Sequence, residues 1–157
     1  MKVSLYLIGK TDEGFVKTAV DLFEKRLKHY LPFSIITLPD IKNAGKISQL
    51  ELKTKEGELL LKQFNNADLV ILLDDKGKQF TSVEFAAYFQ QQMNSGVKNL
   101  CFVIGGAFGF SDAVYARANS KLSLSKMTFT HQMIRILFVE QCYRAMTILK
   151  GESYHHE

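Results

Sequence analysis

Short apolar runs, separated by polar segments, recur along the chain and predict five β-strands. They cover residues 2–8, 33–38, 69–73, 100–104 and about 121–124. The runs at 69–73 and 100–104 are continuously apolar instead of alternating, which is typical of strands buried on both faces of a parallel sheet. Helices must therefore cover both faces.

The segment after the first run predicts a helix. Its apolar side chains recur at helical spacing after Thr11 and Asp12, which we expect to cap the helix. These apolar positions are Phe15, Ala19, Phe23 and Leu27. The chain thus opens with a strand followed by an amphipathic helix.

Capping signals mark two further helices. Ser48 with Glu51, and Thr81 with Glu84, have the spacing of capping boxes, and we expect helices from there to about residues 64 and 93. A short helix at 111–118 and a long one from about 130 to 149 complete five strands and five helices. This alternation predicts an open α/β fold.

Length and composition favour one domain without a membrane segment. The 157 residues suit a single domain spanning 1–157, and we find no repeat, low-complexity segment or linker. The apolar run at 3–9 ends at Lys10, too short for a signal peptide or a membrane span. We expect a soluble cytoplasmic protein. The net charge of +4 suits a polyanionic partner but is also common among ordinary enzymes.

Cysteine and histidine give no metal-binding pattern. Cys101 lies in an apolar strand and Cys142 in an apolar helix, so we interpret both as buried hydrophobic residues. The four histidines lack a spacing that gathers three ligands. They are His29, His131, His155 and His156. We therefore expect no metal.

The last helix has apolar residues around its whole circumference. Among them are Met133, Ile134, Ile136, Leu137, Phe138, Val139, Met146, Ile148 and Leu149. A helix that is apolar all round is usually buried on every side. We expect another subunit to cover the exposed side of this helix, which predicts a homodimer. The alternative is that a second layer of the same chain covers it.

Three loops should meet at one edge of the sheet. Asp74 and Asp75 follow the third strand, Gly105 and Gly106 the fourth, and residues 125–126 the fifth. The carboxyl ends of parallel strands share one edge, where ligands collect. The glycines match neither a Walker A loop nor a dinucleotide fingerprint. A plain glycine turn and a solvated acidic turn therefore stay open as alternatives to a binding site.

The chain resembles the RlmH-type SPOUT-class methyltransferases, which methylate a pseudouridine in large-subunit (23S) ribosomal RNA. The resemblance rests on motifs in the same order along nearly the full chain. These are residues 70–77, 102–109, 122–127, 131–135 and 141–145 and the tail at 154–155. It implies a parallel-sheet fold with a C-terminal trefoil knot, which general connection rules would not predict.

The resemblance also implies a cofactor, a substrate and site residues. It implies S-adenosylmethionine bound by Leu73, Gly105, Leu122, Ser123, Leu124, Ser125, Lys126 and Met127. The acceptor is N3 of a pseudouridine in the assembled ribosome. The residues near it are His131, Arg144, Tyr154 and His155.

One helix cannot easily bring the acceptor-side residues together. His131 and Arg144 are separated by roughly 20 Å of helical rise and lie on largely opposite faces. If both serve one site, a second chain must supply one of them. The alternatives are a solvated or ion-paired Arg144, and a frayed terminus for the tail.

Two other functions are compatible with the sequence. A ribosome-associated RNA-binding protein of the same fold would bind without turnover, and a flavodoxin-like nucleotide binder would need a phosphate motif that the loops lack. Basic residues near the first helix are candidates for phosphate contacts or form a solvated face. They are Lys10, Lys17, Lys25, Arg26 and Lys28.

Overall fold

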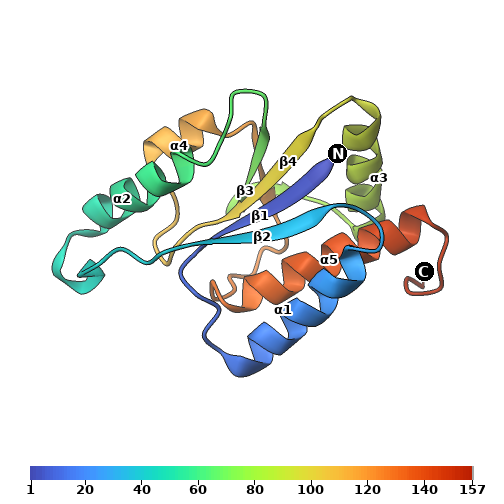
Figure 1. Ribbon diagram of the computed structural model, residues 1–157, viewed down its shortest axis with the longest axis horizontal. Helices are drawn as coiled ribbons and strands as arrows, with labels where there is room; N and C mark the ends of the chain where they lie inside the picture. Colours follow the sequence, from blue (N-terminus) through green and yellow to red (C-terminus); the bar gives the residue numbers. More distant parts are fainter. Residues whose placement is uncertain (157) are drawn as a thin grey trace.

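A computed structural model describes residues 1–156 and contains one five-stranded sheet (Figure 1). All neighbouring strands are parallel, in the order β2-β1-β4-β3-β5. The strands are β1 (Lys2–Ile8), β2 (Phe33–Leu38), β3 (Leu69–Gln79), β4 (Asn99–Ile104) and β5 (Ser120–Ser123). The helices are α1 (Gly14–Leu27), α2 (Gln49–Leu61), α3 (Ser82–Asn94), α4 (Asp112–Arg117) and α5 (Met133–Leu149), with a 3₁₀ turn, η1 (Ala44–Lys46). The predicted α/β alternation is confirmed, and the knot remains a prediction.

Helices cover both faces of the sheet. Helices α1, α3 and α5 pack together on one face, and α2 and α4 on the other (Figure 1). In β4, Leu100, Phe102 and Ile104 join the core under α5, whereas Cys101 and Val103 join the core under α2. The continuously apolar runs are therefore buried on both sides, as predicted.

Helix α5 is held to the sheet by an aromatic contact. The rings of Phe138 and Phe102 have centroids 4.7 Å apart, and both side chains are fully buried. Phe85 of α3 lies against the same two rings. Burial of one such side chain contributes about 1.5–3 kcal/mol. The contact fixes α5 between α1 and α3, directly over the middle of the sheet.

The start and the buried face of α1 differ from the prediction. The helix begins at Gly14 without a side-chain cap, and the hydroxyl of Thr11 accepts a hydrogen bond from Arg135 instead. Phe15 is 62% exposed, whereas Val16 and Val20 are buried. Because residues 15 and 16 are both apolar, the sequence allowed either of them to face the core. Packing against α5 buries Val16 and leaves Phe15 exposed.

The two predicted capping boxes start helices where expected. At α3 the box is complete, because Thr81 Oγ1 accepts from the Glu84 amide and Glu84 accepts from the Thr81 amide. At α2, Ser48 Oγ accepts from the Glu51 amide at 3.1 Å. Both helices end within three residues of the expected positions.

Strand β3 is longer than predicted, because it resumes pairing after an interruption. Leu122 of β5 is opposite both Leu73 and Lys78, so residues 74–77 bulge out of the ladder. A Cβ on Gly77 would lie 2.5 Å from the Leu122 carbonyl carbon, so the close approach requires glycine. The acidic pair Asp74 and Asp75 therefore lies in a bulge inside β3, and not after its end.

Part of the predicted all-round burial of α5 is met within the chain. One side of the helix packs on the sheet, α1 and α3. The outer side includes Ile136 and Leu137, which are half-buried, and Met133, which is 36% exposed. Within residues 1–156, no helix is long and apolar enough to cross a membrane.

Candidate functional site

A cavity of about 640 Å³ opens at the carboxyl ends of β4 and β5, beside the bulge at residues 74–77 of β3. The three loops predicted to meet there all contribute to its wall. Its lining consists of residues 73–76, 104–110, 122–125 and 127–131, with Tyr115 and Ile134. The volume lies in the range of ordinary cofactor sites, roughly 300–1,000 Å³.

The predicted cofactor residues gather in this cavity. Leu73, Gly105, Leu122, Ser123, Leu124, Ser125 and Met127 line it, whereas the exposed Lys126 lies outside the lining. The turn after β5 is ordered by two hydrogen bonds: Ser123 Oγ donates to the Ser125 carbonyl at 2.7 Å, and the Met127 amide donates to Ser125 Oγ at 2.9 Å. These bonds fix the turn that forms this part of the cavity wall.

The glycine loop after β4 brings bare backbone to the cavity. Gly106 and Gly109 form a bridge, and Gly109 has a φ of +80°, which favours glycine. A Cβ on Gly106 would lie 2.5 Å from a carboxylate oxygen of Glu56. Glu56 is buried behind the loop, and its burial, together with the charge of Asp40, raises the pKa of its carboxyl group.

A carboxylate is fixed in the opposite wall of the cavity. Asp74 accepts from the Tyr115 hydroxyl at 2.5 Å and from the Lys76 amide at 2.9 Å. Burial alone would raise the pKa of Asp74, but the bonds from Tyr115 and the Lys76 amide, together with the charge of Lys121 and a bond with Asp75, outweigh it and lower the pKa. Asp74 is therefore ionised at neutral pH and held in place, which differs from a solvated turn.

The remaining lining suits a ligand without phosphates. Phe108 and Phe129, which are partly exposed, and Leu124 provide apolar surface. The basic side chains of the described lining are Lys76 and His131. Backbone groups, apolar surface and one fixed carboxylate can bind a flat heterocycle together with a positive charge.

His131 is held at the edge of this cavity by the neighbouring Arg135. The guanidinium of Arg135 is fully buried and donates to the carbonyl of His131 at 3.1 Å, to that of Ile8 at 2.8 Å and to Thr11 Oγ1 at 2.9 Å. His131 itself precedes α5, which begins at Met133, within three residues of the expected start near residue 130. No role was assigned to Arg135 from the sequence. A charged residue among the apolar residues of this helix was the one signal that it could be buried and bonded.

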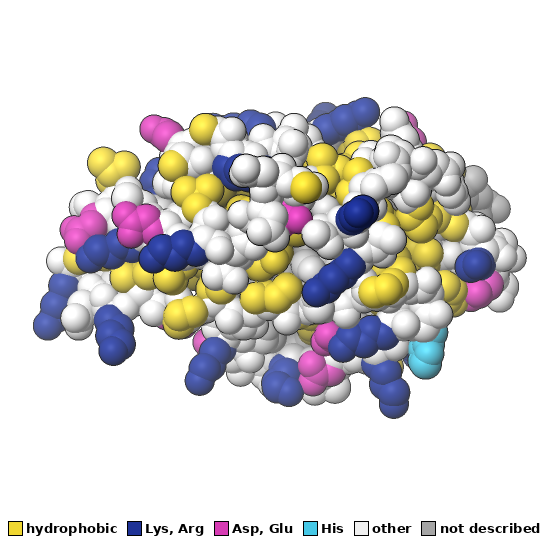
Figure 2. Space-filling view, turned by 45° about the horizontal axis from the view of Figure 1, so that its top comes forward, with side chains coloured by type: hydrophobic (Ala, Val, Ile, Leu, Met, Phe, Trp, Pro, Cys, Tyr) yellow, Lys and Arg dark blue, Asp and Glu magenta, His cyan; other side chains and the backbone are white. Residues whose placement is uncertain are grey.

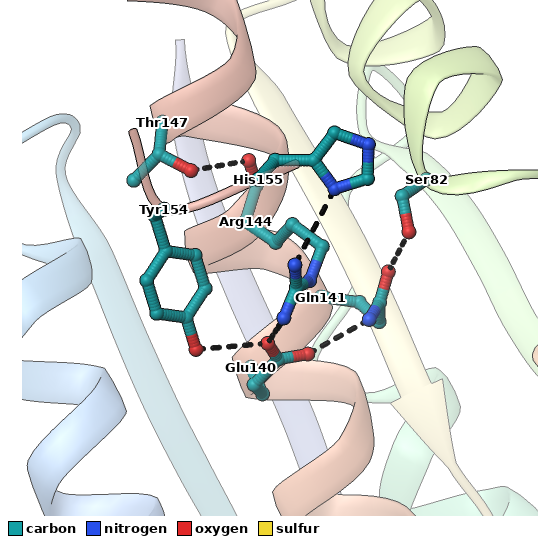
Figure 3. Close-up of polar contacts among 7 residues, drawn as sticks. All are labelled: Ser82, Glu140, Gln141, Arg144, Thr147, Tyr154 and His155. Carbon is teal, nitrogen blue, oxygen red and sulfur yellow. Dashed lines mark hydrogen bonds and ion pairs between the residues drawn. The ribbon is translucent and has the colours of Figure 1, made fainter. Parts of the chain in front are cut away.

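The other acceptor-side candidates form a separate cluster near the end of α5 (Figure 3). Arg144 donates to Glu140 through Nε at 3.1 Å and Nη2 at 2.6 Å, and its Nη1 lies 3.4 Å from His155 Nδ1. The Tyr154 hydroxyl also donates to Glu140, at 3.0 Å. Arg144, Tyr154 and His155 are thus brought together, with Glu140 as an ion-pair partner that the sequence did not single out.

The tail is docked on its own chain and does not fray. Gly151, with a φ of +66°, turns the backbone after α5, and the Glu152 amide donates to the Thr147 carbonyl. The Tyr30 hydroxyl donates to Glu152 at 2.6 Å, and the Tyr154 ring packs edge-on against Tyr143. Contacts to α5 and to the segment after α1 therefore order the tail.

One chain does not unite the four acceptor-side candidates. Of these, His131 lines the cavity, and the other three lie outside the described lining. His131 lies just before α5 and Arg144 within its second half, 13 positions further on, which corresponds to roughly 20 Å of helical rise. The separation expected from the sequence is confirmed.

Neither cysteine nor histidine forms a metal cluster in the described part of the chain. Residues 1–156 contain no group of three or more side chains that could hold a metal ion. Cys101 and Cys142 are both buried, as predicted, and burial raises the pKa of the Cys101 thiol to about 11.

Basic side chains are distributed over the surface. Figure 2 shows Lys and Arg spread across one face, with Asp and Glu among them. On α1, Lys17 pairs with Asp21 and Lys28 with Glu24. Phosphate contacts by the basic residues of α1 therefore remain a prediction.

Comparison with known proteins places the chain in a family. A family model described as "Predicted SPOUT methyltransferase" matches residues 1–155. Proteins named "Ribosomal RNA large subunit methyltransferase H" are similar along their full length: 54% identical in Parabacteroides distasonis over 100% of both chains, and 53% in Cytophaga hutchinsonii over 99% of this chain and 100% of the relative. The chain belongs to the SPOUT methyltransferase family, as the resemblance implied.

We predict that Arg135→Ala lowers the free energy of unfolding by about 3 kcal/mol, because it opens a cavity and leaves buried carbonyl groups without donors. Urea denaturation at one protein concentration measures the change. Lys17→Ala, which removes an exposed ion pair, is the control and should change stability by less than about 0.5 kcal/mol. Equal stabilities for the two variants would contradict the role given to Arg135.

Proposed function

We propose that this protein is an S-adenosylmethionine-dependent methyltransferase that methylates N3 of a pseudouridine in large-subunit ribosomal RNA. The observation that carries the proposal is the cavity at the carboxyl ends of β4 and β5 and the bulge of β3, in a chain of the SPOUT methyltransferase family. The relatives named above are all methyltransferases, which supports an enzyme over a non-catalytic RNA-binding protein.

The chemistry of the cavity fits this cofactor. When bound, S-adenosylmethionine supplies an electrophilic methyl group on a positively charged sulfonium. The ionised Asp74 complements positive charge, and the lack of side chains at Gly105 and Gly106 lets this loop of the cavity wall pack closely against Phe110 and Glu56. Leu73, residues 122–125 and Met127 are the further lining residues that would hold the cofactor.

The acceptor nitrogen must lose a proton as it is methylated. His131 lies at the cavity wall with its backbone fixed by Arg135, so its imidazole, or a water beside it, is placed to accept that proton. Tyr154 and His155 offer an aromatic surface and hydrogen bonds for an unpaired base. Arg144 supplies hydrogen-bond donors close to the imide.

The positions of these residues support a site shared between two chains. His131 and the cluster around Arg144 are at opposite ends of α5, so we infer that the tail of one chain joins the cavity of its partner in a homodimer. The half-buried Ile136 and Leu137 on the outer side of α5 would form the contact. The substrate in this proposal is the assembled ribosome in the cytoplasm.

We predict that the protein runs as a dimer in light scattering at micromolar concentration, because the outer face of α5 needs cover. A monomeric mass would exclude both the homodimer and the shared site.

The proposed activity predicts a specific modification. Ribosomes from cells that lack this protein should gain one methyl group on a large-subunit pseudouridine when incubated with it and S-adenosylmethionine. Mass spectrometry of the ribosomal RNA locates the methyl group. Calorimetry separates the alternatives: cofactor binding without methylation of any ribosomal RNA refutes the proposed substrate, and absence of cofactor binding refutes the enzyme.

We predict that Gly106→Ala weakens S-adenosylmethionine binding about tenfold, because the new Cβ would displace the glycine loop from the buried Glu56 carboxylate. Isothermal titration calorimetry measures the affinity. Gly45→Ala is the control, since the nearest atoms to its added Cβ lie more than 4 Å away. Unchanged affinity in Gly106→Ala would exclude this loop from the cofactor site.

A further inference from the structure

Glu140 lies at the centre of the polar cluster in Figure 3 and engages both carboxylate oxygens. Its Oε1 accepts from Arg144 and from Tyr154, and its Oε2 accepts from Gln141 Nε2 at 2.7 Å. Gln141 in turn accepts from Ser82 Oγ at 2.8 Å, at the start of α3. One carboxylate therefore connects α5, the tail and, through Gln141, α3.

The bonds to Glu140 fix the plane of the Arg144 guanidinium. Both Nε and Nη2 point to the same oxygen, and the guanidinium carbon lies 4.7 Å from the centre of the Tyr154 ring. A free arginine side chain has about 2 kcal/mol of rotamer entropy, which such bonds remove before any substrate binds. The Glu140 carboxylate thus fixes the orientation of the stacked Arg144 and Tyr154 side chains before substrate binds.

This ion pair differs from the surface pairs of the protein. The Glu140 and Arg144 side chains are 17% and 25% exposed, whereas Glu51 and Lys55, at the same spacing on α2, are 48% and 45% exposed. Lower exposure means less screening by solvent, so the Glu140 bonds hold their geometry more firmly. Because Glu140 balances the charge of Arg144, the cluster offers directed hydrogen bonds more than a free positive charge.

We propose that Glu140 is a positioning residue that holds Arg144 and Tyr154 in the orientation in which they meet the acceptor nucleotide. This inference rests on the proposed function, because it assigns Arg144 and Tyr154 to the acceptor side of the site. Glu140 acts through these two side chains and keeps the tail in its docked position on α5.

Glu140→Gln tests the proposal with little change in shape. We expect its kcat for ribosome methylation to fall by up to about 100-fold, because small misplacements of reacting groups have effects of that size. The affinity for S-adenosylmethionine in calorimetry should stay within about twofold of wild type, since the proposal assigns the cofactor to the cavity loops and the Glu140 cluster to the acceptor nucleotide. Retained cofactor affinity also shows that the variant is folded. Glu51→Gln, which breaks the exposed pair on α2, is the matched control and should retain wild-type kcat.

A spectroscopic measurement follows the cluster without substrate. Burial, followed by the hydrogen bond to Glu140 and its charge, raises the pKa of Tyr154, while Arg144 lowers it and Tyr143 raises it slightly. Protein labelled with ¹³C at the tyrosine Cζ can be titrated by NMR, and Tyr154→Phe identifies the signal. We expect the pKa of Tyr154 to fall in Glu140→Gln and to stay unchanged in Glu51→Gln.

Each outcome decides between the alternatives. A kcat in Glu140→Gln equal to that of Glu51→Gln overturns the positioning role. If the wild-type chain methylates no ribosomal RNA, the proposed function fails on that result alone. The Tyr154 titration then decides the inference: a pKa that does not move shows that Glu140 does not hold Tyr154.

Discussion

The buried guanidinium of Arg135 determines where the first turn of α5 lies against the sheet. Its three hydrogen bonds join the first turn of the helix to the end of β1, to the loop at Thr11 and to the backbone of His131. A buried charge is tolerated only when its donors are satisfied, so these groups cannot shift independently. Since α5 is one uninterrupted helix packed through Phe138, fixing its first turn also helps to fix the position of Glu140 further along it.

Much of the fold followed from patterns that depend on near neighbours in the sequence. The continuous apolar runs of β3 and β4 predicted burial on both faces, and the Thr81 capping box predicted the start of α3. Two features depended on distant contacts and were missed. Packing against α5 determines which face of α1 is buried. Pairing with β5 determines that β3 continues past its polar bulge.

The candidate site was predictable where it coincides with strand ends. Gly105 and residues 122–125 lie at the cavity because parallel strands finish at one edge. Arg135 and Glu140 were missed because a charged residue within a helix is most often solvated or paired on the surface. Their partners, among them Ile8 and Tyr154, become neighbours only after the chain has folded. The order of the tail was missed for the same reason, because it depends on Tyr30.

The bulge at residues 74–77 sets a constraint on chain length. Leu122 is opposite Leu73 before the bulge and opposite Lys78 after it. Pairing with β5 therefore fixes the number of residues between Leu73 and Lys78. Successive side chains of a strand point to opposite faces, so a deletion of one residue would turn Lys78 and Gln79 over relative to the sheet. Natural variation in this segment should therefore change side chains and preserve the number of residues. Tolerated changes in length belong to loops without such pairing, such as residues 40–43 before η1.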